Sequence, residues 1–336
     1  MTEPLITRAE PGTAPVSAIL ALVEACRGAD GVTPLSEHAL LHLRYYSAAG
    51  PERDDEPGLD LVLTVDGEIA GYASLDPPAD DPHSDAPEVS GELMIGPDHR
   101  RRGLGRALAA EAAAAAGGHA LRLWAHGDLP AAAALAAAAG FERFRALWQM
   151  RRPLGLDASQ APVPPLAEPV LPTGRTLRSF VPGEDEEAWL ALNARAFAKH
   201  PEQGGWTRHD LEVREREPWF DPAGFFIAEK DGVMTGFHWT KVHPPEPGTP
   251  GPGLGEVYVV GVDPAEQGSG LGRALTLAGL HHLRDRGTAE AMLYVDEANV
   301  AAIRMYEALG FTRATVDAMY RRHVRQAPAG PPLVTG

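Results

Sequence analysis

The sequence predicts an α/β fold built as two tandem copies of one domain. Three observations carry this prediction. A proline-rich segment divides the chain near its middle, RRRGLGRAL at residues 100–108 returns as QGSGLGRAL at residues 267–275, and the same order of elements surrounds both copies. Such internal similarity is the sequence signature of a repeated structural unit.

Each copy has the predicted order strand, glycine-rich turn, helix, strand, helix and strand. In the first copy the predicted elements fall at residues 92–95, 100–105, 104–116, 120–124 and 131–139, and in the second at 257–262, 267–272, 271–286, 291–295 and 300–309. The second helix of each copy ends at a Gly-Phe pair, Gly140-Phe141 or Gly310-Phe311. Glycine just past a helix end is the expected C-cap.

The domain limits follow from the prolines. Six of them lie between Pro153 and Gly174, where they cannot donate the hydrogen bonds of a helix or a central strand. We therefore expect an N-terminal domain at residues 1–152, a linker at 153–174, a C-terminal domain at 175–325 and a disordered tail at 326–336.

Composition limits the kinds of partner. The chain has 336 residues, with 30 Lys and Arg against 46 Asp and Glu, and this net charge of −16 fits neither nucleic acid nor an anionic membrane. A single cysteine, Cys26, excludes an internal disulfide and a cysteine-based metal site, suits a reducing cytoplasm, and is expected to be a small buried apolar residue. Glu3 and Pro4 stand where a secretory signal would need a basic patch and an apolar run. Residues 107–116 are too few for a membrane helix and predict an amphipathic or buried one. We expect a cytoplasmic protein that uses no metal; the oligomeric state is open, with a monomer as the working expectation.

The glycine-rich turn can hold an anion. Successive free N–H groups at the end of a strand, followed by a helix N-terminus, bind phosphate without a basic surface, and glycine lets the backbone approach closely. A Walker loop would need Lys-Ser/Thr after the glycines, and this pair is missing here. A dinucleotide-binding fingerprint would begin with glycine at the position of Arg101, so it fits poorly too. A plain helix start is the structural alternative, and the Arg-rich run at residues 100–102 could be solvated surface charge.

The pattern Gln/Arg-x-x-Gly-x-Gly between a strand and a long helix, with an Asn-opened helix about 30 residues later, resembles the GNAT N-acetyltransferase family. That resemblance implies a mixed sheet flanked by helices that binds the pyrophosphate of acetyl-CoA on the turn. More closely, the chain is similar to the mycothiol synthase branch of the family in GVTPLSEHAL (31–40), LWAHG (123–127), HPEQGGWT (200–207), GFHWTKVHP (236–244), GLGEVYVVGVDP (253–264) and LYV with NVAAIRMYEALGF (293–311). This similarity implies acetyl transfer from acetyl-CoA to the cysteinyl amine of cysteinyl-glucosaminyl-inositol (desacetylmycothiol), giving mycothiol. Because no cysteine lies in the expected site, direct attack in a ternary complex is expected.

Alignment on the Gly-Phe pairs places Tyr306 opposite Ala136 and Arg304 opposite Ala134. A phenol with a pKa of ~10 can protonate a leaving thiolate, and the resemblance gives Tyr306 the role of general acid. The alternative is a packed aromatic whose hydroxyl is satisfied by a neighbour. The first copy, with alanine here, is expected to be non-catalytic and to bind acetyl-CoA structurally or not at all.

Glu256 opens the strand before the second turn, and alternation predicts Glu256, Tyr258 and Val260 on one face. The resemblance makes Glu256 the general base and a substrate contact; the alternative is a solvated glutamate. A splayed strand there would expose a backbone N–H as oxyanion donor.

The run at residues 239–243 predicts a strand with Lys241 and His243 on one face and His238 on the other, which argues against a His238/His243 metal pair. The proline- and glycine-rich stretch at 243–253 predicts a loop beside the site.

By resemblance, further residues contact the two substrates. The acceptor contacts are Glu37, Glu202, Lys241, Glu256 and Tyr294. The acetyl-CoA contacts in the second copy are Val260, Gly261, Val262, Gln267, Gly268, Ser269, Gly270, Leu271, Gly272, Arg273, Asn299, Val300, Ala301, Ala302, Ile303 and Arg304. Those in the first copy are Leu93, Met94, Ile95, Arg100, Arg101, Arg102, Gly103, Leu104 and Gly105.

Two other functions stay open. One is a GNAT enzyme for another amine, such as a peptide N-terminus or an aminoglycoside, whose positive charge would suit the acidic chain. The other is a non-catalytic acetyl-CoA-binding module, which would bind without releasing acetyl.

Overall fold

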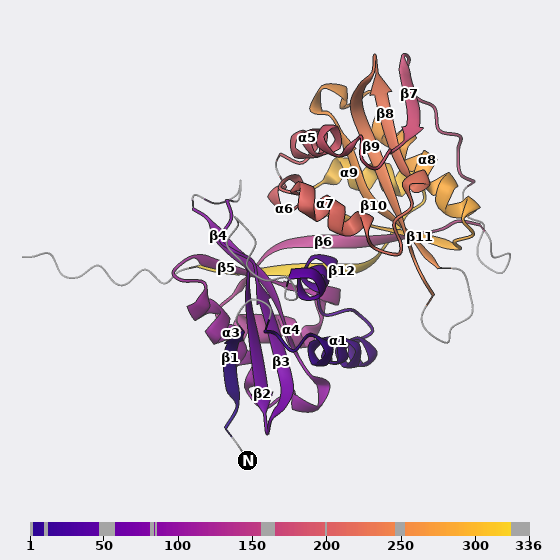
Figure 1. Ribbon diagram of the computed structural model, residues 1–336. Coiled ribbons are helices and arrows are strands. Elements are labelled where there is room, and N and C mark those ends of the chain that lie inside the picture. The colour runs from indigo at the N-terminus through magenta and orange to yellow at the C-terminus, as the bar shows by residue number, and fades with distance from the viewer. Residues whose placement is uncertain are drawn as a thin grey trace, which may run out of the picture. The chain divides into compact units, whose positions relative to one another are not determined.

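The computed structural model describes residues 3–9, 13–46, 58–80, 84, 86–155, 165–198, 200–245 and 253–323. The chain forms two compact units (Figure 1): unit 1 is Met1–Arg145 with Asp317–Gly336, and unit 2 is Ala146–Val316. The predicted α/β class and the repeated order of elements are confirmed. Residues 156–164 of the predicted linker, the tail from residue 326 and residues 246–252 of the predicted loop lie outside the described residues. In the described part of the chain, no helix is long and apolar enough to cross a membrane.

Unit 1 is a sheet covered by helices on both faces. Its strands, in spatial order, are β1 (Leu5–Ala9), β2 (Leu59–Val65), β3 (Glu68–Leu75), β4 (Glu88–Ile95), β5 (Ala120–Ala125) and β12 (Thr312–Arg322), and only the β4–β5 pair is parallel. Its helices are α1 (Val16–Asp30), α2 (Glu37–Leu41), the π-helix η1 (His42–Tyr46), α3 (Leu104–Ala115) and α4 (Pro130–Ala138), with short 3₁₀ turns η2 (Pro97–His99) and η3 (His126–Asp128). Helices α3 and α4 share one apolar core with the sheet, while α1 and α2 share another. Cys26 of α1 is a free, buried thiol, as predicted.

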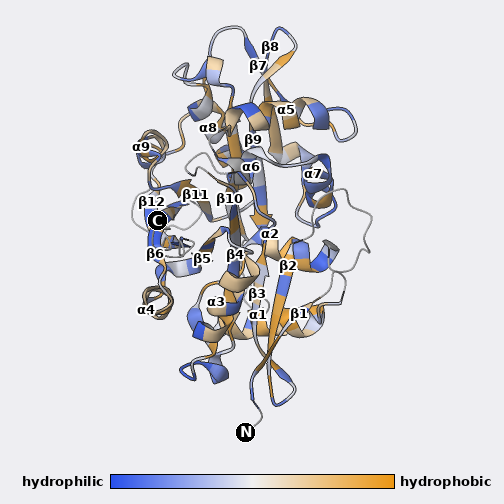
Figure 2. Cartoon of the chain, turned by 90° about the vertical axis from the view of Figure 1, so that its left-hand side faces the viewer, coloured by the Kyte–Doolittle hydropathy of each residue, from blue (hydrophilic) through white to orange (hydrophobic). Residues whose placement is uncertain are grey.

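Unit 2 repeats this plan. Its strands, in spatial order, are β6 (Glu142–Pro153), β11 (Glu290–Asp296), β10 (Leu254–Val262), β9 (Val233–His243), β8 (Phe225–Lys230) and β7 (Arg175–Ser179), with β10–β11 parallel. Its helices are α5 (Glu186–Ala196), α6 (Pro201–Gly204), α7 (Arg208–Glu215), α8 (Leu271–Asp285) and α9 (Val300–Ala308), with 3₁₀ turns η4 (Pro222–Gly224) and η5 (Pro264–Glu266). Helices α5 and α7 pack on an aromatic core on one face, and α8 and α9 pack on an aliphatic core on the other. Figure 2 shows α7 as mainly hydrophilic, and its buried apolar residues are Leu211 and Val213.

The last strand of each sequence repeat lies in the unit formed by the other repeat. Strand β6, from the first repeat, pairs antiparallel with β11 over Leu147 to Pro153, and β12, from the second repeat, pairs antiparallel with β5 over Ala318 to Arg322. The compact units therefore differ from a division of the chain at the linker. The order of elements along the chain is the same in both repeats, so it does not reveal which sheet a closing strand joins.

Glycine and asparagine begin the helices that matter for the site. Gly103 and Gly270 are the N-cap residues of α3 and α8, with φ of 81° and 88°, a left-handed backbone that favours glycine. Asn299 is the N-cap of α9, and its side-chain oxygen accepts a hydrogen bond of 3.1 Å from the Ala302 N–H. The predicted Asn-opened helix is thus confirmed.

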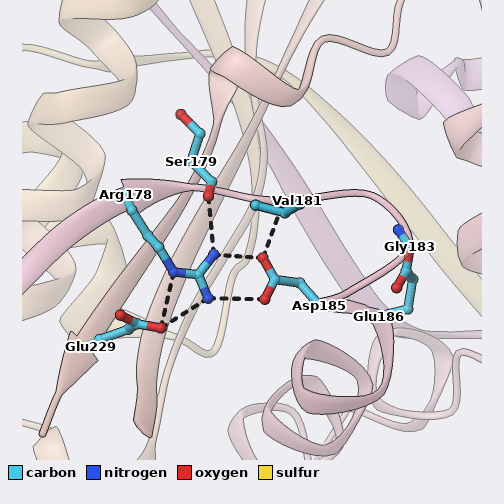
Figure 3. Close-up of polar contacts among 7 residues, drawn as sticks. All are labelled: Arg178, Ser179, Val181, Gly183, Asp185, Glu186 and Glu229. Atoms are coloured by element: carbon cyan, nitrogen blue, oxygen red, sulfur yellow. Dashed lines mark hydrogen bonds and ion pairs between the residues drawn. The ribbon is translucent and has the colours of Figure 1, made fainter. Parts of the chain in front are cut away.

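A charged network in unit 2 fixes the start of α5 (Figure 3). The Arg178 guanidinium binds both carboxylate oxygens of Asp185, at 2.5 and 2.9 Å, and an oxygen of Glu229 at 2.8 Å. Asp185 also accepts a hydrogen bond from the Val181 N–H at 2.8 Å. Burial alone would raise the pKa of Asp185, but the hydrogen bonds from Arg178 and Val181 outweigh it and lower that pKa. This bidentate pair orients α5, which places Trp189 in the aromatic core.

A second charged cluster lies in unit 1. His126 stands between two acidic residues, with Nδ1 3.0 Å from Asp317 and Nε2 3.5 Å from Glu92. Burial alone would lower the pKa of His126, but the hydrogen bond with Asp317 and the neighbouring Glu92 carboxylate raise it to about 10. His126 is therefore an imidazolium in the folded protein at neutral pH.

Candidate active site

The second glycine-rich turn is held by hydrogen bonds of Asp263, the residue before it, and is open at Gly268 and Gly270. Before the turn, the Asp263 N–H donates to the Thr235 carbonyl at 2.9 Å, and its carboxylate accepts from the Ala265 N–H at 3.0 Å and pairs with Arg195. Gly268 and Gly270 have φ of 80° and 88°, and a Cβ built on either would meet no atom within 4 Å. A ligand can therefore approach this backbone directly.

The first turn of α8 offers N–H groups to an anion. Gly270 has no side chain to cap the helix, and among the described residues only the Leu271 N–H of this turn has a local partner, the Ser269 hydroxyl at 3.3 Å. The N–H groups of Gly272 and Arg273 follow at the positive end of the helix dipole. The exposed side chains of Arg273 and Arg304 make no ion pair with any residue that the structure describes. These groups fit the phosphates of a coenzyme A thioester.

Beside the turn, strands β10 and β11 part. Their parallel ladder joins residues 254–256 to residues 290–292 and ends there, whereas β10 stays paired with β9 as far as Val262. Beyond Glu256, the edge of β10 on the β11 side is therefore free of this ladder. The two strands are thus splayed before the turn, and Val260, Gly261 and Val262 lie on the splayed part of β10.

A β-bulge corrects one prediction. Val257 pairs with Thr240 and Val259 with Trp239, so Tyr258 is an extra residue in β10. Tyr258 and Val259 both pack in the aromatic core, while Val260 packs in the aliphatic core with α8 and α9. The prediction that Val260 shares a face with Tyr258 is wrong, because the extra residue reverses the alternation after it.

Glu256 has a histidine partner. Its carboxylate is 9% exposed, and Oε2 lies 2.6 Å from Nε2 of His243, a side chain that is 33% exposed. Glu256 is directly opposite Lys241 in the β9–β10 pair. His238 lies on the other face, with Nδ1 2.7 Å from the Leu275 carbonyl, and burial lowers its pKa to about 4. The two histidines thus point apart, as predicted.

Tyr306 lies on the opposite face of the sheet from this carboxylate. It comes from α9, is 8% exposed, and packs in the aliphatic core with Val257, edge-on to Phe311 at 5.8 Å between ring centres. Its hydroxyl makes no hydrogen bond with the part of the chain that the structure describes. Burial raises the pKa of Tyr306 to about 12. The alternative, a packed core tyrosine whose hydroxyl is hydrogen-bonded to a neighbouring residue, therefore has no such residue in the described part of the chain.

The remaining predicted acceptor contacts have different surroundings. Lys241 is buried, with Nζ 4.4 Å from the ring centre of Trp219. Tyr294 is 42% exposed, and its hydroxyl accepts a hydrogen bond of 2.8 Å from Gln149 of β6. The side chain of Glu202, in α6, lies outside the described residues. Glu37 is the first residue of α2, in unit 1.

The first repeat lacks the corresponding chemistry. Ala136 is buried at the position of Tyr306. Ser90 pairs with Arg122 as Glu256 pairs with Met292, so a serine stands where the second repeat has the carboxylate.

The strand and glycine-rich turn of the first repeat also differ from those of the second. Strand β4 has no bulge against β3, and its ladder with β5 continues to Glu92. Of the predicted contacts, Arg100 is engaged with Asp30, at 2.7 Å from each carboxylate oxygen, and with the Ile95 carbonyl at 3.0 Å. Arg101 and Arg102 are exposed.

Sequence reasoning missed the contact between His243 and Glu256. The two residues are diagonal neighbours on antiparallel strands, which brings their side chains within reach. The signal would have been the register of the β9–β10 pair, which the intervening loop does not reveal.

Comparisons with known proteins identify the family of the chain. The model of the acetyltransferase (GNAT) family matches residues 29–141 and 188–311. A mycothiol acetyltransferase of Thermobispora bispora is 59% identical over 323 residues, covering 96% of this chain and 100% of that protein, and one of Thermomonospora curvata is 57% identical over 306 residues, covering 91% and 93%.

Two solved structures share the fold. A tandem GNAT protein from the clavulanic acid biosynthesis pathway matches with a TM-score of 0.68 at 22% identity, covering 97% of this chain and 100% of that one. A GCN5-related N-acetyltransferase from Sphaerobacter thermophilus matches with a TM-score of 0.61 at 24% identity, covering 96% of each chain. The chain therefore belongs to the GNAT acetyltransferase family, in the tandem branch whose relatives are named mycothiol acetyltransferase.

Proposed function

We propose that this chain transfers the acetyl group of acetyl-CoA to the cysteinyl amine of cysteinyl-glucosaminyl-inositol, which gives mycothiol, and that the second repeat alone performs the chemistry. The acceptor is inferred from the name of the relatives at 57% and 59% identity. The observation that carries the chemistry is the parting of β10 and β11 after Glu256, with a carboxylate on one face and the Tyr306 phenol on the other.

Acetyl-CoA supplies its acetyl group as an activated thioester. The N–H groups of Gly272 and Arg273 and the side chains of Arg273 and Arg304 bind its phosphates, because they are open or unpaired among the described residues. The free edge of β10 at residues 260–262 holds the chain that leads to the thioester. The acetyl carbonyl then lies in the opening between the strands.

Glu256 is the general base. The acceptor amine arrives as an ammonium ion, and Glu256 takes one of its protons so that nitrogen regains its lone pair. The amine attacks the thioester carbonyl, a C–N bond forms, and the carbonyl oxygen becomes an oxyanion. A backbone N–H on the free edge of β10 stabilises this charge, because the donor is fixed before the reaction begins.

Tyr306 is the general acid. When the tetrahedral intermediate collapses, the C–S bond breaks and the coenzyme A thiolate takes the phenolic proton. Burial keeps Tyr306 protonated at neutral pH, and its hydroxyl makes no bond with another described residue. The phenolate takes back the second proton from the new amide nitrogen, Glu256 releases the first proton to solvent, and the neutral amide product leaves.

The acceptor contacts in unit 2 are Lys241 and Tyr294, together with Glu202. Tyr294 is held by Gln149, so its ring has a fixed hydroxyl direction. The first repeat takes no part in catalysis, because Ser90 and Ala136 replace the base and the acid. We place the protein in the cytoplasm, where its buried free Cys26 stays reduced.

Mass spectrometry of the reaction products tests the proposal. The full chain is incubated with acetyl-CoA and a panel of amines: cysteinyl-glucosaminyl-inositol, a peptide with a free N-terminus, and an aminoglycoside. The expected result is one acetyl group on the cysteinyl nitrogen of the first amine and far slower acetylation of the other two. Preferred acetylation of another amine, or acetyl-CoA binding without transfer, would contradict the proposal.

A further inference from the structure

Three sequence motifs meet in the aromatic core of unit 2. Trp206 comes from HPEQGGWT, Trp239 from GFHWTKVHP and Tyr258 from GLGEVYVVGVDP. The ring centres lie 5.3 Å apart for Trp239 and Tyr258, and 6.2 Å apart for Trp206 and Tyr258. The proposed reaction uses none of these three rings, so their convergence needs another explanation.

Arg214 of α7 ties the cluster together. Its buried guanidinium donates from Nε to the Tyr258 hydroxyl at 2.8 Å and from Nη1 to the Asp210 carbonyl at 2.8 Å. It also lies 3.9 Å from the ring centre of Trp206. Thr207 and Asp210 form a capping box that fixes the first turn of α7. The phenol of Tyr258 is thus anchored to a capped helix by a charge-assisted hydrogen bond.

Tyr258 is also the extra residue of the β10 bulge. A bulge interrupts the ladder and leaves one residue unpaired, so something outside the ladder must favour it over regular pairing. In unit 2 the side chain of that residue is bound by Arg214 and packed between Trp219 and Trp239, at 5.1 and 5.3 Å. In unit 1, strand β4 has no bulge, and its parallel ladder reaches two positions further.

The bulge controls what surrounds the opening between the strands. It follows Glu256 by two residues, and the parallel ladder ends at Glu256. The Tyr258 ring also lies 5.1 Å from Nζ of Lys241. Regular pairing would move Val260 to the other face and redirect the free edge of β10.

We propose that Arg214 and Tyr258 are positioning residues, whose contact holds the β10 bulge and so sets the direction of the Glu256 carboxylate, the Lys241 ammonium and the free edge of β10. They act through these groups and not on the reacting atoms. The inference rests on the proposed function for its kinetic consequence, while the bulge itself can be followed without turnover.

The test uses the full chain with two conservative variants and a matched control. Tyr258→Phe removes only the hydroxyl, and Arg214→Lys keeps the charge but loses the guanidinium geometry. Tyr72→Phe is the control, because it removes another buried phenol bond, 2.5 Å from Asp60 in unit 1. For each variant, steady-state rates and backbone hydrogen exchange of residues 254–262 are measured.

Both site variants are expected to lower kcat/KM for the acceptor at least tenfold and to speed exchange in β10 at least tenfold. The double variant should be no worse than the more affected single variant, because one contact is lost in each case. Tyr72→Phe should change neither quantity.

Wild-type rates and exchange in Tyr258→Phe would overturn the inference. So would a kinetic loss with unchanged exchange, because the hydroxyl would then act on the substrate and not on the bulge. If the wild-type chain does not acetylate the acceptor at all, the proposed function fails, yet the exchange comparison still decides whether Arg214 and Tyr258 hold the bulge.

Discussion

Replacing Tyr306 by phenylalanine removes one oxygen from a buried ring and leaves the ring packing intact. A positioned general acid contributes roughly 10²–10⁴-fold in rate. The leaving thiol has an ordinary pKa of ~8.5, so its thiolate can depart without complete protonation, and we expect the lower end of that range. Turnover should therefore fall about 10²-fold, which corresponds to ~2.7 kcal/mol of activation free energy.

The same change should not weaken the fold or donor binding. The Tyr306 hydroxyl makes no hydrogen bond with any described residue, so its removal breaks no such bond and leaves no described polar group unpaired. The thermal unfolding midpoint is expected to stay the same or rise slightly. The dissociation constant of acetyl-CoA should change less than twofold, because the anion-binding groups belong to α8 and the turn.

The assay measures acetylated acceptor and free coenzyme A by liquid chromatography and mass spectrometry, because the acceptor carries its own thiol and would react with a thiol reagent. Tyr320→Phe, a buried tyrosine of β12 in unit 1, is the matched control and should keep full activity. In the wild type, kcat should not fall through loss of this acid until pH approaches about 12. A Tyr306→Phe enzyme within threefold of wild-type turnover would refute its role as acid.

Three other changes give distinct outcomes. Gly270→Ala forces alanine to a φ of 88°, at a cost of ~1–2 kcal/mol, and should raise KM for acetyl-CoA at least fivefold in initial-rate assays. Gly103→Ala, at a φ of 81°, is the control and should leave that KM unchanged. Equal effects of the two variants would contradict the assignment of acetyl-CoA binding to the second turn. His243→Gln keeps a hydrogen-bond donor for Glu256, whereas His243→Leu does not. Because a hydrogen bond to a charged group contributes ~1.5–3 kcal/mol, kcat/KM should fall at least tenfold further in the leucine variant than in the glutamine variant. Similar kcat/KM values in the two variants would show that the contact between His243 and Glu256 does not contribute to catalysis. The pKa of His126 is raised to about 10 in the folded protein, against ~6.5 in the unfolded chain, so the unfolded chain releases this proton first as pH rises. The free energy of unfolding should therefore fall between these two pH values, by up to ~1.4 kcal/mol per pH unit. Urea titrations at several pH values should show this slope in the wild type and a reduced slope in His126→Asn.

Local signals account for what the sequence predicted well. The glycines at the helix starts and ends, the Asn299 cap and the helical periodicity of α8 and α9 act within a few residues, so they can be read along the chain. The repeat then strengthens the assignments around the glycine-rich turn, because each of those elements is predicted twice.

Non-local pairing accounts for what the sequence did not predict. The bulge at Tyr258 depends on Arg214, which lies 44 residues away along the chain, and its phase decides the face of Val260. The contact between His243 and Glu256 depends on the register of two strands. The identities of Glu256 and Tyr306 as base and acid came from resemblance, and they stay predictions.

The exchanged closing strands make each half of the chain necessary to the other. The sheet that carries Glu256 is completed by β6, which also brings Gln149 to Tyr294, and β6 comes from the half that has Ser90 and Ala136 at the positions of Glu256 and Tyr306. Cutting the chain between residues 154 and 174 would give two fragments that each carry the wrong final strand, so neither should be recovered as a native monomer unless both are co-expressed. The first repeat can therefore be retained for its closing strand alone, because the sheet of unit 2 is incomplete without β6.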